Sequence, residues 1–181
     1  MRRLLLALVV ALVLAPGASA VSLPGLQGGK APWLPEWNHL AARLRADGLP
    51  RMGQEAFVVH IHQHLDLYVN GKHEPIPALI GINVQERFLS PIHTHDFTGV
   101  IHVESPTKRH FTLGQFFDVY GVRFSSSCVG GECGGAHVFV NGKEFLGDPR
   151  TVVLAAHQEL VVAAGAAPKK IPARYAFPAG L

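Results

Sequence analysis

The chain has 181 residues, and its 16 Lys and Arg against 13 Asp and Glu leave a formal net charge of +3. The sequence contains no Lys/Arg cluster and no basic stripe interleaved with aromatic residues, so it does not indicate nucleic-acid binding. Nineteen glycines and thirteen prolines divide the chain into short pieces, which favours strands and turns over long helices.

The first twenty residues have the order of parts that is typical of a secretory signal peptide. Arg2 and Arg3 supply a positive start, residues 4–15 form an uncharged apolar run, and residues 18–20 form an A-x-A cleavage site. The apolar run is too short to span a bilayer comfortably, so we expect a secreted or periplasmic protein without a permanent membrane anchor. Cleavage would leave about 161 residues, the size of one domain, and a formal charge of about +1.

Residues 21–56 are predicted to form a leader with one helix. Apolar side chains recur at helical spacing between Trp33 and Asp47, and Gly48 follows as a stop signal. The rest of the chain, residues 57–181, is predicted to be a histidine-rich β domain.

The segment that begins at Phe57 and ends at Val69 alternates between two kinds of side chain, as a strand does. One face is apolar apart from Gln63, and the other face carries three histidines in succession. Alternate side chains on a strand stand about 6.6 Å apart. Two imidazoles at that spacing can reach one metal ion with bonds of about 2 Å each. We therefore predict a metal site built on a β-sheet, and the three histidines on this face are His60, His62 and His64.

Two Asn-Gly pairs, Asn70-Gly71 and Asn141-Gly142, are strong signals of tight hairpins with type I′ turns. A capping-box pattern at residues 112–115 predicts a short helix that ends at Gly121. Other strands are expected at residues 78–84, 99–104, 122–125, 137–140, 151–154 and 159–164. The predicted fold is mainly β, a small barrel or sandwich with one or two short helices, and a β-grasp-like sheet is the alternative.

A second histidine group begins at the H-x-H pair formed by His93 and His95, and His102 follows in the next predicted strand. Such a pair, joined by a third histidine from a neighbouring strand, is a known way to build a three-His site with an open position. Asp96 and Glu104 are candidate ligands, hydrogen-bond acceptors that orient the imidazoles, or general bases. The preferred ligand set is His62, His93, His95 and His102, with His60 and His64 as alternates.

The ligand types narrow the choice of metal only in part. Imidazole nitrogens suit Zn, Cu, Ni and Fe about equally. After cleavage Met52 is the only methionine, which argues against a methionine-rich Cu(I) carrier. Nitrogen ligands in an oxidising compartment favour Zn(II) or Cu(II), and the sequence does not separate these two.

Cys128 and Cys133 lie in a glycine-rich loop, and a signal peptide implies an oxidising compartment. The expected state is therefore a disulfide that closes a small ring. The alternative is a thiolate metal site that includes His137.

An H-x-H pair with a later Glu and His also occurs in cupins, but Glu104 lies farther from His95 than the usual cupin spacing. This spacing puts a cupin in doubt, and a cupin-like barrel remains an alternative. The phrases HTHDFTGVIHVES and FTLGQFFDVYG resemble a group of uncharacterised secreted bacterial proteins, over a region from about Phe57 to the C-terminus. This resemblance implies a shared fold and carries no function over.

Three functions follow as hypotheses. The first is a secreted or periplasmic protein that binds Zn or Cu. The second is a small metalloenzyme, a hydrolase or an oxidoreductase, whose three His ligands leave a position open. The third is a β domain that binds a protein or cell-wall partner without metal, in which case the histidines would not converge. The sequence does not decide whether the protein is an enzyme, and it names no protein partner.

Overall fold

The computed structural model describes residues 23–181. The predicted signal peptide, residues 1–20, lies outside this range. Within it, no helix is long and apolar enough to cross a membrane. The prediction of a mainly β fold with one or two short helices is confirmed. The strands form a mixed sheet, and no closed barrel is found among the described residues.

The main sheet has seven strands, six of them in the order β10-β9-β11-β1-β6-β5, while β2 pairs with the end of β1. Two small two-stranded sheets, β3-β4 and β7-β8, accompany it. The strands are β1 Val59–Val69, β2 Lys72–Glu74, β3 Ile82–Asn83, β4 Phe88–Leu89, β5 Ile92–His93, β6 Val100–Ser105, β7 Cys128–Val129, β8 Glu132–Cys133, β9 Ala136–Val140, β10 Lys143–Phe145 and β11 Glu159–Ala164. The helices are α1 Leu40–Ala46, α2 Leu113–Tyr120 and the 3-10 helix η1 Pro149–Thr151.

Strand β1 joins the two halves of the sheet. Its first half pairs antiparallel with β6, and its second half runs parallel to β11 and antiparallel to β2. Leu65 and Leu67 are buried on one face, together with Gln63, whose Nε2 donates a hydrogen bond to the Ile101 carbonyl at 3.0 Å. The predicted alternation is thus confirmed along β1, and it leaves His60, His62 and His64 on the opposite face.

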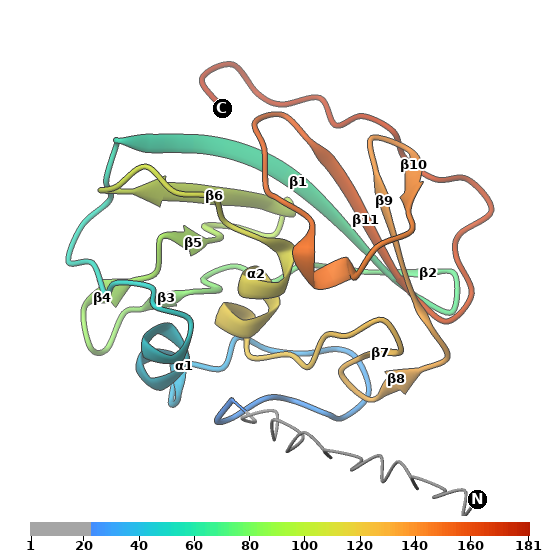
Figure 1. Ribbon diagram of the computed structural model, residues 1–181, viewed down its shortest axis with the longest axis horizontal. Helices are drawn as coiled ribbons and strands as arrows, with labels where there is room; N and C mark the ends of the chain where they lie inside the picture. The colour runs from blue at the N-terminus through green and yellow to red at the C-terminus, as the bar shows by residue number, and fades with distance from the viewer. Residues whose placement is uncertain (1–22) are drawn as a thin grey trace, which may run out of the picture.

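The two faces of the sheet are covered differently. Figure 1 shows α1 and α2 on one side of β1 and β6, and the C-terminal tail on the other side. Helix α2 begins at the predicted capping box, in which Thr112 Oγ1 accepts from the Gln115 backbone N–H at 3.3 Å. It ends at Gly121, whose φ of 78° is left-handed and favours glycine. The fully buried Phe116 and Phe117 place the hydrophobic core on the helix side of the sheet.

Both predicted hairpin turns are present. Asn70 and Gly71 have φ of 49° and 79°, and Asn141 and Gly142 have φ of 50° and 79°. Positive φ at both central residues is the mark of a type I′ turn. These turns connect β1 to β2 and β9 to β10.

The leader helix is shorter than the predicted range of residues 33–47. Pro35 disfavours helical geometry at Leu34, and the helix extends only over Leu40–Ala46. Leu40 and Leu44 are fully buried and belong to the same core as the strands. Residues 40–44 therefore share one hydrophobic core with the strands.

Several predicted strands are wrong in extent. Only β3 is extended within residues 78–84, because Leu79 and Gly81 have φ of 61° and 73°. Residues 122–125 and 151–154 contain isolated bridges in place of strands. Phe57 was expected on the core face, but it precedes β1 and is 68% exposed.

Candidate metal centre

Cross-strand register brings the two histidine groups together. His62 on β1 lies opposite His102 on β6, and His102 lies opposite His93 on β5. One step along the same face, His60 lies opposite Glu104. Directly opposed residues of antiparallel strands have Cβ atoms about 4.5–5.5 Å apart on the same face. The sheet therefore gathers, on one face, residues that are up to 44 positions apart in the sequence.

The first group, which we call the His93 group, consists of His93, His95, His102 and Glu104. Each side chain offers one ligand atom, and these four atoms all lie within 4.8 Å of one another. The Nε2 atoms of His93 and His95 are 3.2 Å apart, and His102 Nδ1 lies 3.4 Å from Glu104 Oε1. Two nitrogens bound to one tetrahedral ion at about 2.0–2.1 Å stand about 3.3 Å apart. The spacing of the group thus suits a single small ion.

The second group, which we call the His60 group, consists of His60, His62 and the same Glu104. His60 Nε2 is 3.6 Å from Glu104 Oε1, and the His62 ring packs edge-on against His60 and His102. His62 is buried, and burial together with its neighbour His60 lowers the pKa of His62 below its ordinary value. Its imidazole is therefore neutral at physiological pH, which is the form that binds a metal.

Hydrogen bonds to backbone carbonyls that precede β5 hold the H-x-H segment in place. His93 Nδ1 donates to the Ser90 carbonyl at 2.9 Å, so Nε2 carries the lone pair that faces the group. Between the two histidines, Thr94 is fully buried and donates from Oγ1 to the Pro77 carbonyl at 2.9 Å. These two hydrogen bonds hold the His93 ring and the backbone at Thr94 in place.

Burial also sets the charge of the centre. Desolvation, with a contribution from the neighbouring imidazoles, lowers the pKa of His93 to about 4 and that of His102 to about 3. Desolvation, with repulsion from Glu55, raises the pKa of Glu104 to about 7. At neutral pH the two imidazoles are neutral, and the carboxyl of Glu104 is close to half ionised. His102 Nδ1, His62 Nε2 and Glu104 Oε2 are buried and have no hydrogen-bond partner. Unpaired buried polar atoms are costly, and a bound cation would satisfy them.

His64 does not join these groups. Its Nδ1 lies 3.0 Å from Glu159 Oε2 and its Nε2 lies 2.9 Å from the Thr98 carbonyl, so both nitrogens face acceptors and both donate. Although burial alone would lower the pKa of His64, the hydrogen bond and charge of Glu159 raise it above the ordinary value. His64, Asp66 and Glu159 do lie close enough to form a further acidic group, but His64 has no lone pair left for an ion. The ring of Tyr175 stacks on His64 with centroids 3.8 Å apart.

Asp96 also lies outside the two groups. Its Oδ1 accepts hydrogen bonds from the backbone N–H and the hydroxyl of Thr98, and these bonds lower its pKa. Of the two carboxylates singled out in the sequence, only Glu104 faces the histidines.

One residue near the centre carried no sequence signal. Glu55 Oε1 lies 3.4 Å from His95 Nε2 at the exposed edge of the His93 group. It belongs to the leader, where no alternation or motif pointed to it. An open cavity of about 680 Å³ beside it is lined by Gln54, Glu55, Phe57, Leu79, Ile82, Leu89 and His95.

The predicted disulfide is present, with Cys128 and Cys133 joined across β7 and β8. Neither sulfur is therefore free to bind a metal. His137, the histidine considered as a partner of a thiolate site, is exposed, and its Nδ1 lies 2.9 Å from Glu144 Oε1.

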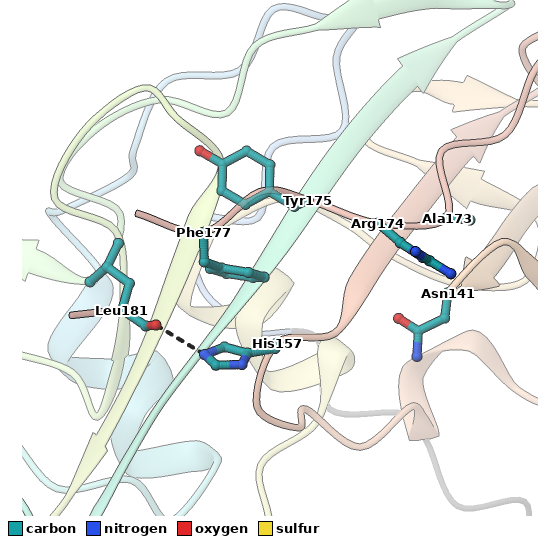
Figure 2. A pocket seen from close by; sticks show the side chains of 7 residues that line it. All are labelled: Asn141, His157, Ala173, Arg174, Tyr175, Phe177 and Leu181. Carbon is teal, nitrogen blue, oxygen red and sulfur yellow. Dashed lines mark hydrogen bonds between the residues drawn. The ribbon is translucent and has the colours of Figure 1, made fainter. Parts of the chain in front are cut away.

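A separate cavity of about 690 Å³ lies under the C-terminal tail. Figure 2 shows His157 beside Phe177, with its Nε2 hydrogen-bonded to the Leu181 carbonyl at 2.9 Å. Tyr175, which lines this cavity, stacks on His64, so the cavity borders the histidine face of β1. None of its lining residues belongs to either histidine group.

No family model, no curated protein and no solved structure matches this chain.

Proposed function

We propose that this protein is a secreted or periplasmic metal-binding protein that holds Zn or Cu in the His93 group. The observation that carries the proposal is the 3.2 Å separation of the Nε2 atoms of His93 and His95, which matches the edge of a tetrahedral coordination sphere. His102 Nδ1 and Glu104 Oε1 complete a donor set of three nitrogens and one oxygen. This set favours Zn(II), because four N and O donors in a closed arrangement are typical of zinc, while Cu(II) prefers a tetragonal geometry.

The state of the donors before binding supports the same proposal. The low pKa values of His93 and His102 mean that no proton has to leave them at neutral pH. The hydrogen bond from His93 to Ser90 orients the ring in advance. The binding free energy is therefore not spent on deprotonating or turning these two ligands.

The test is metal analysis of protein purified without a histidine tag, combined with thermal unfolding. Zn(II) at a free concentration of 100 times its Kd should stabilise the fold by about 2.7 kcal/mol. For a domain of this size, that corresponds to a rise in Tm of about 5–10 °C.

The variant for this test is His95→Ala, because His95 is exposed and its loss leaves the core intact. We expect the variant to bind Zn(II) at least about 10–100-fold more weakly than the wild type. His137→Ala is the matched control, since His137 is also an exposed histidine beside a glutamate. A wild type that shows no metal and no change in Tm, or a His95→Ala variant with wild-type affinity, would refute the proposal.

A second candidate is a metalloenzyme in which Glu104 acts as general base. The observation that favours it is the pKa of Glu104 of about 7, which suits proton transfer at neutral pH. The open cavity beside His95 would admit a small substrate. Hydrolysis of model esters by Zn-loaded protein, compared with the Glu104→Gln variant, tests this candidate. Equal rates in the two proteins would rule out Glu104 as the base.

A further inference from the structure

We propose that the His60 group binds a second metal ion and that Glu104 bridges the two ions. This inference rests on the proposed function of the His93 group and adds a second site to it. The paired centre would take two ions of Zn(II) or of Cu(II), on five imidazoles and one carboxylate.

The two groups together contain more donor side chains than one metal ion uses. A structural Zn site takes four ligands, and the His93 group alone supplies four. His60 and His62 remain, on the same face and next to the same carboxylate. His62 is 6% exposed, and its Nε2 is buried without a partner. A buried imidazole nitrogen that has no protein partner in so polar a cluster is explained by a cation beside it.

Glu104 lies between the two groups. Its Oε1 is 3.4 Å from His102 Nδ1 and 3.6 Å from His60 Nε2. Its Oε2 is buried and unpartnered, while the whole residue is 2% exposed. Both contacts are made to the same oxygen, Oε1, so this oxygen faces both groups and would bridge the two ions. In two-metal sites the ions stand about 3.5–4 Å apart, a separation that one bridging carboxylate spans.

The strands on the two sides of β6 supply different members of the two groups. His93 and His95 approach from β5 on the far side of β6, whereas His60 and His62 approach from β1. His102 and Glu104 lie on β6 between them, and Glu104 is the residue common to both groups.

The first experiment counts metal ions. Metal-free protein is loaded with excess Zn(II) and desalted. Its Zn content is then measured by mass spectrometry and divided by the protein concentration. We expect two ions per chain in the wild type and one in His60→Ala, whose side chain is 39% exposed. His62→Gln, which keeps a polar side chain at the buried position, should also retain one ion. His137→Ala, the exposed control, should retain two.

The outcomes separate the two proposals. One ion in the wild type, with its loss in His95→Ala, would overturn the second site and leave the proposed function intact. No bound ion would overturn both. The proposal of a separate ion at the His60 group would also be overturned by either of two results. His60→Ala and His62→Gln could both retain two ions, or the folded variants could both bind none.

A second experiment tests the bridge. In wild-type protein loaded with two Cu(II), coupling through a shared carboxylate should lower the integrated electron paramagnetic resonance signal below the copper content. His60→Ala with one Cu(II) should give the full signal. A full signal from two copper ions in the wild type would overturn the bridging role of Glu104.

Discussion

Replacing Glu104 with glutamine should stabilise the metal-free protein and reduce the stabilisation that Zn(II) adds to it. Glu104 is 2% exposed, and its pKa in the fold is about 7 against an ordinary value of 4.5. A carboxyl with a raised pKa contributes stability that is fully present below pH 4.5 and is lost as the pH rises through about 7. The difference between these two pKa values corresponds to roughly 3 kcal/mol.

Glutamine has nearly the same shape but cannot ionise, so the variant escapes this loss. Without metal, Glu104→Gln should be more stable than the wild type by about 3 kcal/mol at pH 8, and the difference should vanish near pH 4. With saturating Zn(II) this difference should shrink by about 1.4–2.7 kcal/mol, because the variant lacks one anionic ligand and binds the ion about 10–100-fold more weakly.

Chemical denaturation at pH 4, 6 and 8, with Zn(II) and with a chelator, measures both effects. Glu144→Gln is the control, since Glu144 is an exposed glutamate beside a histidine and should show neither effect. The reasoning would be refuted if Glu104→Gln destabilised the metal-free protein at pH 8. It would also be refuted if Zn(II) stabilised wild type and variant equally.

Three further predictions concern the disulfide, the pH dependence of binding and the C-terminal tail. Replacing both cysteines with serine opens a ring of about six residues and should cost about 2 kcal/mol in denaturant unfolding, with metal content unchanged; loss of metal would contradict the placement of the site. The logarithm of the Zn(II) affinity should fall with a slope of at least about one per pH unit below pH 7, because Glu104 takes up a proton, and more steeply below about pH 4, where His93 does. A pH-independent affinity would exclude both ligands. Tyr175→Ala removes the ring stacked on His64 and should expose the tail to proteolysis. The raised pKa of His64 contributes stability that is fully present below pH 6.5 and is lost as the pH rises through the raised pKa. The wild-type tail should therefore become more sensitive to proteolysis with rising pH. Cleavage that is independent of pH would argue against a charged His64.

Local sequence patterns determined the elements that depend on local chemistry. The alternation of side chains along β1, the two Asn-Gly turns, the capping box of α2 and its end at Gly121 follow from backbone preferences and periods of a few residues. The disulfide follows from two cysteines in a flexible loop, with no others in the chain. The same patterns placed three histidines on one face of a strand and singled out the H-x-H pair.

The tertiary structure alone decided which histidines meet. Strand alternation gives His60, His62 and His64 equal standing, since all three point to one face. His64 lies opposite Val100 on the β6 side of β1 and opposite Glu159 on the β11 side, so no other histidine faces it across either strand. Register is a long-range property, because it is set by the packing of whole strands and not by the residues next to each histidine.

The sequence also left the role of Glu104 open among ligand, hydrogen-bond acceptor and base. Its pairing with His60 across the sheet, at a position between two groups of imidazoles, depends on the neighbours of β6 on both sides. Glu55 reaches His95 from the leader, a contact between segments that share no local pattern. A charged side chain acquires such a position, and the pKa that goes with it, only when the chain folds and removes water from around it.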